Sequence, residues 1–422
     1  MTLAGEQKRL RRDIGWNLIP VVLLGVIGLG INFAIGKLWG SAALGAFNLV
    51  TITFFSFAVL GAWSLQYSVL RAVAEAAHEP ARIPAIVVGA LVPGLGIAAL
   101  ATAAYLALRP PLVALQGEAV GEGMLWVAPG LFCFAVNKIL LGVVNGLRRM
   151  RAFAIYTSLR YILIGVGLLL AYAADLDGEQ LPVIWTFAEG VLLLVLVVEL
   201  VATVSLRACA GWRAEAARHL DFGTRGVGAT LASEINSKLD VWMLGNYVGN
   251  AQVGIYSLAA AIYEGVAQLA VVVQNNLNPV IAQRLGEHDA AAVEDLVRRT
   301  RRWFVPAVVG ACVVGAALYP IVIPLLTGDD TFAEGSRSFA IMMAGIALSS
   351  PYLPFIQILL MAAKPGWYTA YVLATAVINL VACVVLIPPL GLEGAAIATS
   401  ISLVASALLL RWFARRKVQL RI

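Results

Sequence analysis

Charge is scarce in this sequence. Only 13% of its 422 residues are charged, about half the share found in soluble globular proteins, whereas 61% are hydrophobic and the mean hydropathy is +0.87. This composition excludes an ordinary soluble domain, and no segment between the apolar runs is long enough to form one. We therefore expect a polytopic membrane protein, whose formal charge of +6 mainly reflects its orientation in the membrane.

Cysteine and histidine are also rare. The four cysteines lie in or beside apolar runs without paired spacing, so neither a disulfide framework nor a metal site is expected. They are Cys133, Cys209, Cys312 and Cys383. The three histidines, His78, His219 and His288, are expected to be solvated residues of cytoplasmic loops.

Motifs for soluble ligands are missing as well. No Gly-x-x-x-x-Gly-Lys-Ser/Thr loop occurs, which argues against direct use of ATP. A nucleic-acid surface needs basic residues gathered on one face, and here they are spread along the chain, so no nucleic-acid partner is expected.

About twelve continuous apolar segments are present. A bilayer core needs about 20 apolar residues per helix. The segments that meet this length lie near 14–36, 44–68, 83–108, 123–145, 153–173, 182–206, 222–247, 252–281, 303–326, 337–361, 366–388 and 392–412. The sequence thus predicts an all-α fold of about twelve transmembrane helices.

The charges between these segments predict an orientation. Arginines gather at positions such as 148–151 and 298–302, on one side of the predicted spans, and acidic residues gather at 175–179 and 329–334, on the other. Cytoplasmic loops carry an excess of Lys and Arg, and an even number of spans returns the chain to its starting side. Both termini are therefore expected in the cytoplasm.

The two halves of the chain resemble each other at an offset of 209 residues. Residues 38–49 align with residues 247–258, pairing Gly40 with Gly249 and Gly45 with Gly254. In each half a helix ends, the chain turns at glycine and the next helix begins. This pattern predicts a parallel repeat of two six-helix bundles, residues 1–210 and 211–422, with a substrate site between them.

A polar face runs along the predicted span 222–247. At 100° per residue, Glu234, Asn236, Ser237, Lys238 and Asp240 fall on one side of this helix, and apolar residues fall on the other. Ionisable groups at bilayer depth are costly and normally face a protein interior or a watery cavity. The pattern therefore indicates the lining of a transport passage.

Further ionisable residues lie within predicted spans. The basic ones, Lys138, Arg160 and Arg225, join Lys238 as candidates for binding an anionic cargo. The acidic ones, Glu189, Glu199 and Glu264, join Glu234 and Asp240 as candidates for ion coupling. Structural roles remain open: Arg160 could pair with Glu189 or Glu199, Lys238 could pair with Glu234, and Lys138 and Arg225 could extend to the membrane surface.

Two segments resemble a known family. Residues 238–259, which contain Asp240, Gly249 and Gly254, and residues 379–399, which contain the run Gly-Ala-Ala-Ile-Ala-Thr, are similar to polysaccharide biosynthesis membrane proteins. These belong to the superfamily of multidrug, oligosaccharidyl-lipid and polysaccharide (MOP) exporters. The resemblance implies two six-helix bundles around a central cavity, like those of the MATE branch.

The resemblance also implies a function. Its members include flippases that move a polyprenyl-pyrophosphate-linked oligosaccharide, such as an O-antigen or exopolysaccharide repeat unit, across the bacterial inner membrane by alternating access. The expected partners are then this lipid-linked glycan, membrane lipids and polysaccharide assembly proteins. No catalytic residue and no cofactor is implied, and coupling to H⁺ or Na⁺ stays open.

Other functions fit the sequence less well. The first two predicted helices hold no buried arginine, unlike those of lipid II flippases, and Asp13 lies only at the mouth of the first span, unlike the acid of multidrug/cation antiporters. A membrane-embedded glycan polymerase or ligase would need a long outer loop or an Asp-x-Asp pair in a cytoplasmic loop, and neither is present.

Overall fold

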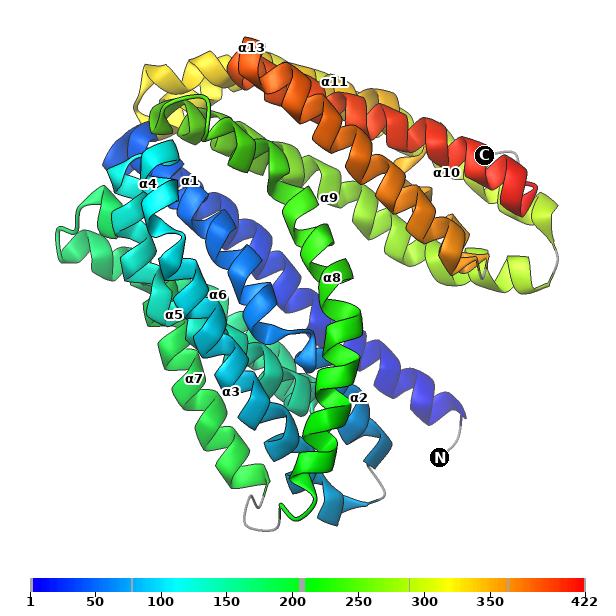
Figure 1. The fold of residues 1–422 in the computed structure, drawn as a ribbon. Coiled ribbons are helices and arrows are strands. Elements are labelled where there is room, and N and C mark those ends of the chain that lie inside the picture. The colour runs from blue at the N-terminus through cyan, green and yellow to red at the C-terminus, as the bar shows by residue number, and fades with distance from the viewer. Residues whose placement is uncertain (1–2, 77–78, 205–208, 288, 363, 421–422) are drawn as a thin grey trace. The chain divides into compact units, whose positions relative to one another are not determined.

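The computed structural model describes residues 3–76, 79–204, 209–287, 289–362 and 364–420, with side chains from residue 25 onward apart from scattered positions that include Ser237. Within these ranges the chain forms helices and no strand (Figure 1). The first eight α-helices are α1 (Leu3–Ala62), α2 (Leu65–Glu75), α3 (Ile83–Ala107), α4 (Arg109–Gln116), α5 (Glu118–Gly146), α6 (Met150–Ala173), α7 (Val183–Thr203) and α8 (Trp212–Leu244).

The second part of the chain continues the same pattern. Its helices are α9 (Asn250–Gly286), α10 (Ala290–Thr327), α11 (Ser336–Ser349), α12 (Ile358–Met361) and α13 (Pro365–Phe413). Short 3-10 segments, η2 (Pro80–Arg82), η3 (Gly178–Gln180), η4 (Asp330–Gly335) and η5 (Leu353–Phe355), link some of them, and a π-helical turn follows at Ala414–Val418.

The chain divides into two compact units. Unit 1 comprises residues 1–31 and 46–238, and unit 2 comprises residues 32–45 and 239–422. The units are defined by which residues pack together. As a result, α8 belongs to unit 1 up to residue 238 and to unit 2 after it, and residues 32–45 of α1 belong to unit 2. The division into sequence repeats at residue 210 remains a separate prediction.

Two of the long helices are interrupted at glycine. Gly40 in α1 and Gly391 in α13 have positive φ angles of 84° and 55°, a backbone region that favours glycine. In α1 a Cβ atom on Gly36 would lie 3.6 Å from the Leu44 side chain, a contact that a straight helix could not make over eight residues. In α13 the Tyr371 hydroxyl meets the Ser406 hydroxyl, so its two limbs also run back along each other. Each helix therefore holds two of the predicted spans.

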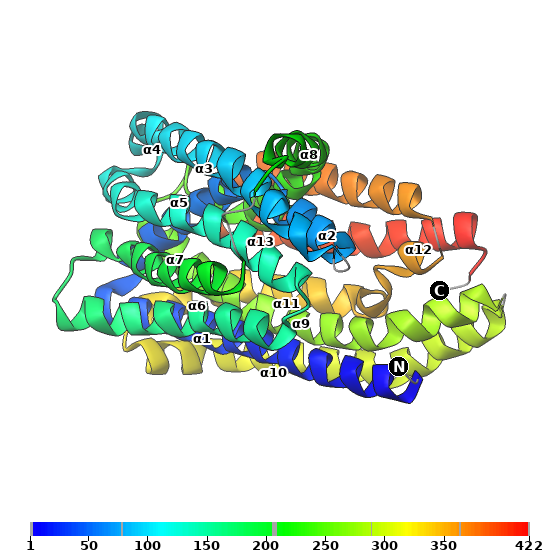
Figure 2. The same ribbon diagram turned by 90° about the horizontal axis from the view of Figure 1, so that it is seen from below.

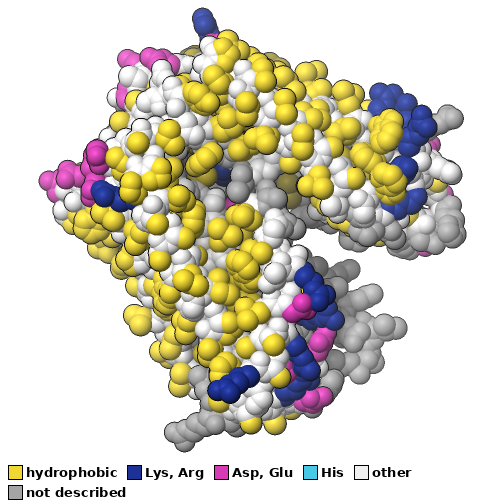
Figure 3. All heavy atoms as spheres, in the orientation of Figure 1, with side chains coloured by type: hydrophobic (Ala, Val, Ile, Leu, Met, Phe, Trp, Pro, Cys, Tyr) yellow, Lys and Arg dark blue, Asp and Glu magenta, His cyan; other side chains and the backbone are white. Residues whose placement is uncertain are grey.

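All twelve predicted spans coincide with helical segments. By length and apolarity alone, eight described helices could cross a membrane, or nine if α11 and α12, bent by 58°, form one span. The number is below twelve because α1 and α13 each count once and because the polar face of α8 lowers its hydropathy. Large apolar side chains such as Leu169, Leu194 and Leu325 are exposed, and apolar side chains cover much of the visible helix surface (Figure 3). The predicted all-α multi-pass membrane fold is confirmed.

Helix α5 lies at the centre of unit 1. It packs against α2, α3, α6 and α7 (Figure 2). Its apolar residues, among them Ala135, Ile139 and Leu140, are buried in this core because the neighbouring helices cover nearly all of its faces. Polar residues of α5 are therefore held among other helices.

In unit 2, α9 crosses the second limb of α1 at two glycines. A Cβ atom on Gly45 would overlap the carbonyl group of Asn250, and one on Gly254 would overlap that of Ser41. Positions 41 and 250 are 209 residues apart, as are positions 45 and 254. The two contacts thus interchange under the offset of the sequence repeat, as contacts across a two-fold axis do.

Candidate functional site

The most buried ionic group in unit 1 joins α5, α6 and α7. Arg160 Nε lies 2.6 Å from Glu189 Oε1, and Arg160 Nη2 donates to Glu189 Oε2 at 3.2 Å. Asn137 Nδ2 donates to the same Oε2 and to the Glu189 carbonyl oxygen, both at 2.9 Å. The Nε contact is short but poorly aligned, so the aligned hydrogen bonds are those from Nη2 and Nδ2. Of the two partners predicted for Arg160, Glu189 is the one that pairs with it in the structure.

Lys138 lies beside this group without an ion-pair partner. Its ammonium nitrogen is 5.2 Å from the centre of the Phe134 ring, whose face also receives the Arg160 guanidinium at 4.6 Å. Arg160, Glu189 and Glu234 are within electrostatic range. No carboxylate among the described residues is within ion-pair distance of Lys138, whereas Arg160 is neutralised by Glu189. A half-buried ammonium in this position can receive an anion.

Two other predicted residues form ion pairs elsewhere in unit 1. Glu199 pairs with Arg149 and accepts a hydrogen bond from the Tyr156 hydroxyl at 2.9 Å, so it is separate from the Arg160 group. Arg225 pairs with Asp221 at 2.7 Å and is exposed. Arg225 therefore reaches solvent rather than the helix interior.

The polar face of α8 is partly described. Glu234, Asn236 and Lys238 are half-buried, in the last turns of α8 that belong to unit 1. The side chain of Ser237 lies outside the described residues. Their proposed roles in cargo binding and ion coupling remain predictions.

Asp240 is the centre of a polar group in unit 2. Its Oδ2 atom accepts hydrogen bonds from the Tyr256 hydroxyl at 2.6 Å and the Thr399 hydroxyl at 3.2 Å. Asn379 and Cys383 of α13 contact each other, and Cys383 is within electrostatic range of Asp240. Both of Asp240's hydrogen bonds reach the same carboxylate oxygen. Glu264 is half-buried on α9 and within electrostatic range of Tyr263.

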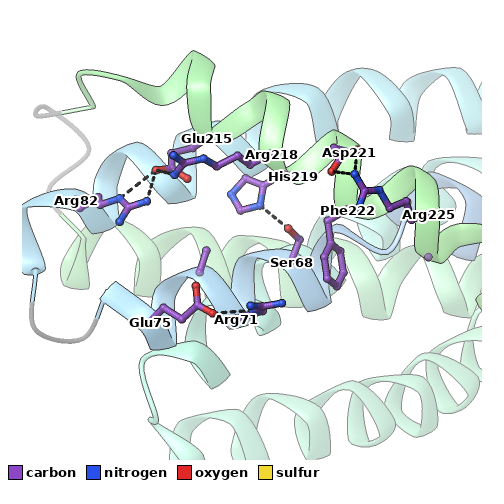
Figure 4. Close-up of a pocket in the computed structure, with 12 residues that line it drawn as sticks. Ser68, Arg71, Glu75, Arg82, Glu215, Arg218, His219, Asp221, Phe222 and Arg225 are labelled. Carbon is purple, nitrogen blue, oxygen red and sulfur yellow. Dashed lines mark hydrogen bonds and ion pairs between the residues drawn. The ribbon is translucent and has the colours of Figure 1, made fainter. Parts of the chain in front are cut away.

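A charged pocket of about 570 Å³ opens in unit 1 where α2, η2 and α8 meet (Figure 4). We call it the α2–α8 pocket. Its charged lining consists of four arginines and three acids: Arg71, Arg82, Arg218, Arg225, Glu75, Glu215 and Asp221. Glu215 is nearly buried, and its Oε1 accepts from Arg82 Nη2 at 2.9 Å and from Arg218 Nη1 at 3.1 Å. The carboxylate thus ties the start of α8 to the segment before α3.

The expectation of a solvated loop is wrong for His219. This residue lies in α8, is 1% exposed and lines the α2–α8 pocket. Its Nε2 lies 3.1 Å from the Ile86 carbonyl, which can only accept, so Nε2 carries the proton and Nδ1 accepts from the Ser68 hydroxyl at 2.7 Å. Burial lowers the pKa of His219 below its ordinary value. His78 and His288 lie outside the described residues.

Sequence reasoning missed the neutral partners at these sites. Asn137 and Phe134 of α5, like Tyr256 and Thr399 around Asp240, were not among the predicted residues. Asn137 carried a signal, because it is a polar residue beside Lys138 within an apolar run. The others look like ordinary helix residues until the fold brings them to a charged group.

The fold and these buried ionic groups define a multi-pass helical membrane protein with ionisable residues inside its helix bundle. The sequence matches the family described as polysaccharide biosynthesis protein over residues 10–285, and the MatE family over residues 230–385. The chain belongs to the polysaccharide biosynthesis protein family. No curated protein sequence matches it.

Solved structures share its fold at low sequence identity. The lipid II flippase MurJ in an inward closed conformation superposes with a TM-score of 0.77 at 14% identity, covering 95% of this chain and 87% of that one. An inward-facing multidrug resistance MATE family transporter of the MOP superfamily gives 0.75 at 15% identity, covering 96% and 98%. The Vibrio cholerae MATE transporter VcmN in its bent form gives 0.59 at 15% identity, covering 97% and 96%. At these identities the likeness concerns the fold.

Proposed function

We propose that this protein is a flippase that moves a polyprenyl-pyrophosphate-linked oligosaccharide, such as an O-antigen or exopolysaccharide repeat unit, across the bacterial inner membrane. Membership of the polysaccharide biosynthesis protein family supports this cargo class. The observation that carries the proposal is Lys138, an ammonium held inside unit 1 with no carboxylate partner among the described residues. A passing pyrophosphate can approach such a group and leave again.

Within this proposal Lys138 and Arg160 have different roles. Lys138 binds the pyrophosphate as a point charge. Arg160 is engaged by Glu189, and its guanidinium covers the Phe134 ring beside Lys138, so it holds the positive end of the group in place. Lys238, Asn236 and Ser237 would extend the polar path along α8. The lipid tail stays in the bilayer throughout.

The experiment is complementation of a strain from which the gene has been deleted. We expect the deletion to accumulate polyprenyl-linked repeat units on the cytoplasmic face, Lys138→Met to fail to restore export, and Lys138→Arg to restore part of it because the charge is kept. Arg337→Gln, which removes a side chain 85% exposed in its pair with Glu393, is the control and should export normally. Normal export by Lys138→Met would contradict the proposal.

The same strains separate the alternative cargoes. A lipid II flippase would restore growth to cells that lack their own, and a multidrug/cation antiporter would lower the cells' sensitivity to cationic drugs without changing glycan export. The surplus positive charge at Lys138 favours an anionic cargo over a cationic drug. A membrane-embedded polymerase would change the chain length of the glycan, and export from the cytoplasmic leaflet would continue.

We also propose that transport is coupled to H⁺ or Na⁺ through Asp240. The two hydroxyl donors hold one carboxylate oxygen in place, and a carboxylate oxygen is a suitable ligand for a proton or a hard cation. Asp240→Asn keeps the size and both hydrogen bonds but removes the charge. We expect this variant to bind cargo and lose the dependence of transport on the ion gradient, measured in proteoliposomes with an imposed Na⁺ or pH gradient.

A further inference from the structure

The lining of the α2–α8 pocket is rich in arginine. Four arginines and three carboxylates line it, together with the buried ring of His219, whose Nε2 lies 3.1 Å from the Ile86 carbonyl. One carboxylate oxygen of Glu215 accepts hydrogen bonds from both Arg82 and Arg218 (Figure 4), and Arg82 also pairs with Glu79 at 3.7 Å. Each of these arginines thus has a carboxylate beside it, and a ligand can reach only the N–H donors that these pairs leave unused.

The guanidinium groups at this pocket have donors to spare. Arg71 hydrogen-bonds Glu75 through Nε alone, Arg218 hydrogen-bonds Glu215 through Nη1 alone, and Arg225 hydrogen-bonds Asp221 through Nη2 alone. Each guanidinium has five N–H donors in a planar fork that matches the oxygens of a phosphate group. The Arg218 and Arg225 side chains are 65% and 76% exposed, so they can turn toward a ligand with little loss of packing.

The position of the pocket along the chain indicates which phosphate it meets. Three predicted spans end or begin beside it, at residues 68, 83 and 222, and the lining residues Ser68, Arg82 and Phe222 stand at these boundaries. Arg218 and Arg71 lie outside the spans, Phe222 lies at the edge of one, and Arg225 lies one turn inside the same span. Arginines on both sides of an aromatic residue at a span boundary match the headgroup depth of a bilayer.

The walls of the pocket are fixed before any ligand arrives. A Cβ atom on Gly89 of α3 would come within 2.9 Å of the α8 backbone, so these helices are in close contact. The buried ring of His219 links α8 to Ser68 of α2 and to the Ile86 carbonyl of α3. Because the walls are preorganised, binding costs mainly the ordering of the exposed arginines.

We propose that the α2–α8 pocket binds the phosphate ester headgroup of an anionic membrane lipid. The phosphate is held by Arg218, Arg225 and Arg71, and Phe222, which lies between the two α8 arginines, packs against the lipid. Arg82 is a positioning residue, since it neutralises Glu215 and leaves Arg218 for the ligand. This inference requires only that the protein lies in a membrane, and it stands apart from the glycan flippase assignment.

The test measures lipid binding to the full chain in a non-ionic detergent, with fluorescently labelled phosphatidylglycerol as the probe. We expect Arg218→Gln combined with Arg225→Gln to weaken binding by roughly tenfold, because charged hydrogen bonds to the phosphate are lost. Raising the salt from about 0.05 M to about 0.5 M should weaken wild-type binding and have little effect on the double variant, since salt screens exposed charges.

Unit 2 supplies a matched control. Arg284→Gln combined with Arg299→Gln removes two exposed arginines with the same spacing from their acids, i,i+3 to Glu287 and i,i+4 to Asp295. This control should bind the probe as the wild type does. If the pocket variant does not fold, Arg71→Gln alone replaces it, because that side chain is 69% exposed and its pair lies on the surface of α2. Equal binding by the wild type and either pocket variant would overturn the proposal.

Two further ligands identify the source of the phosphate. Glycerol 3-phosphate presents the same ester without acyl chains, and we expect it to displace the probe only at far higher concentration than unlabelled phosphatidylglycerol. Displacement at equal concentration would overturn the assignment to a lipid. Phosphatidylcholine tests the charge, and binding as strong as that of phosphatidylglycerol would overturn the requirement for a net negative headgroup.

Discussion

At the residue scale, Arg160 and Lys138 differ in what neutralises them. Both cations lie against the same ring of Phe134, and only Arg160 has a carboxylate partner among the described residues. Glu189 is fully buried and is also held by Asn137. The arrangement makes Glu189 the residue on which the charge balance of the group depends.

Replacing Glu189 tests this dependence. Glu189→Gln leaves the buried Arg160 guanidinium without its counter-charge, and we expect a loss of about 3–5 kcal/mol in the free energy of unfolding. Thermal unfolding in detergent measures the change. Glu122→Gln breaks the more exposed pair with Arg109 and should cost about 1 kcal/mol or less. Adding Arg160→Gln to Glu189→Gln should recover part of the loss, and a further equal loss would contradict the ion-pair account.

His219 predicts a dependence of stability on pH. Its pKa is lowered by burial, so below about pH 6.5 the unfolded chain binds a proton that the folded chain resists. Stability should therefore fall as the pH is lowered through this window and stay level above it. The charged groups nearby are Glu215 and Arg218 of α8, Arg71 and Glu75 of α2, and Arg82 before α3.

The measurement compares unfolding temperatures at about pH 7.5 and about pH 5.5. The wild type should lose more stability on acidification than His219→Gln, which cannot take up the proton. Equal losses in both proteins would assign the acid sensitivity to the carboxylates instead.

The sequence predicted the environment of some ionisable residues and not of others. The Arg160–Glu189 pair was one of two pairings left open, because Arg160, Glu189 and Glu199 are all ionisable groups in apolar runs. The burial of His219 was not predictable, since Ser68 and Ile86 are more than 130 residues away. Local sequence around His219 is charged and resembles a solvated loop, and only the packing of α8 on α2 and α3 covers the ring.

At the scale of elements, apolar runs predicted the helices well. A helix in lipid must satisfy its backbone polar groups internally, so a long apolar run has few alternatives. The turn at Gly40 was predicted from the repeat and is confirmed by its positive φ. The bend between α11 and α12 was not, although Pro351 and Pro354 lie within the predicted span 337–361, because a membrane helix can also contain proline without a break.

The glycine crossing between α1 and α9 gives a sharp prediction at this scale. Gly254→Ala inserts a methyl group into the space held by the Ser41 carbonyl, and Gly45→Ala does the same at Asn250. Backbone cannot move aside as a side chain can, so each change should cost about 1–3 kcal/mol or more. Gly310→Ala in α10, where no atom lies within 4 Å, is the control and should be neutral or stabilising by up to about 1 kcal/mol.

Thermal unfolding and transport should respond together at the crossing. If Gly254→Ala and Gly310→Ala unfolded at the same temperature, the close approach of the two helices would be refuted. Because the two contacts interchange under the repeat offset, we expect Gly45→Ala and Gly254→Ala to have similar effects.

At the scale of the whole molecule, packing and repeat give different divisions of the chain. The repeat divides it near residue 210. In the division by packing, residues 32–45 belong to unit 2 and most of α8 belongs to unit 1. The start of α8 packs on α2 and α3 through His219 and is tied to η2 through Glu215. The sequence predicted the repeat from its glycines, but membership of a unit depends on long-range contacts.

Orientation in the membrane links the proposed cargo to the α2–α8 pocket. The predicted orientation, with both termini in the cytoplasm, puts the pocket at the cytoplasmic leaflet and Glu179 of η3 on the outer side. We predict that a membrane-impermeant maleimide added to intact cells labels Glu179→Cys and does not label Arg218→Cys, in a background in which Cys133, Cys209, Cys312 and Cys383 are replaced by alanine. Permeabilised cells should label both. Labelling of Arg218→Cys from outside would reverse the orientation, and it would place both the pocket and its lipid in the outer leaflet.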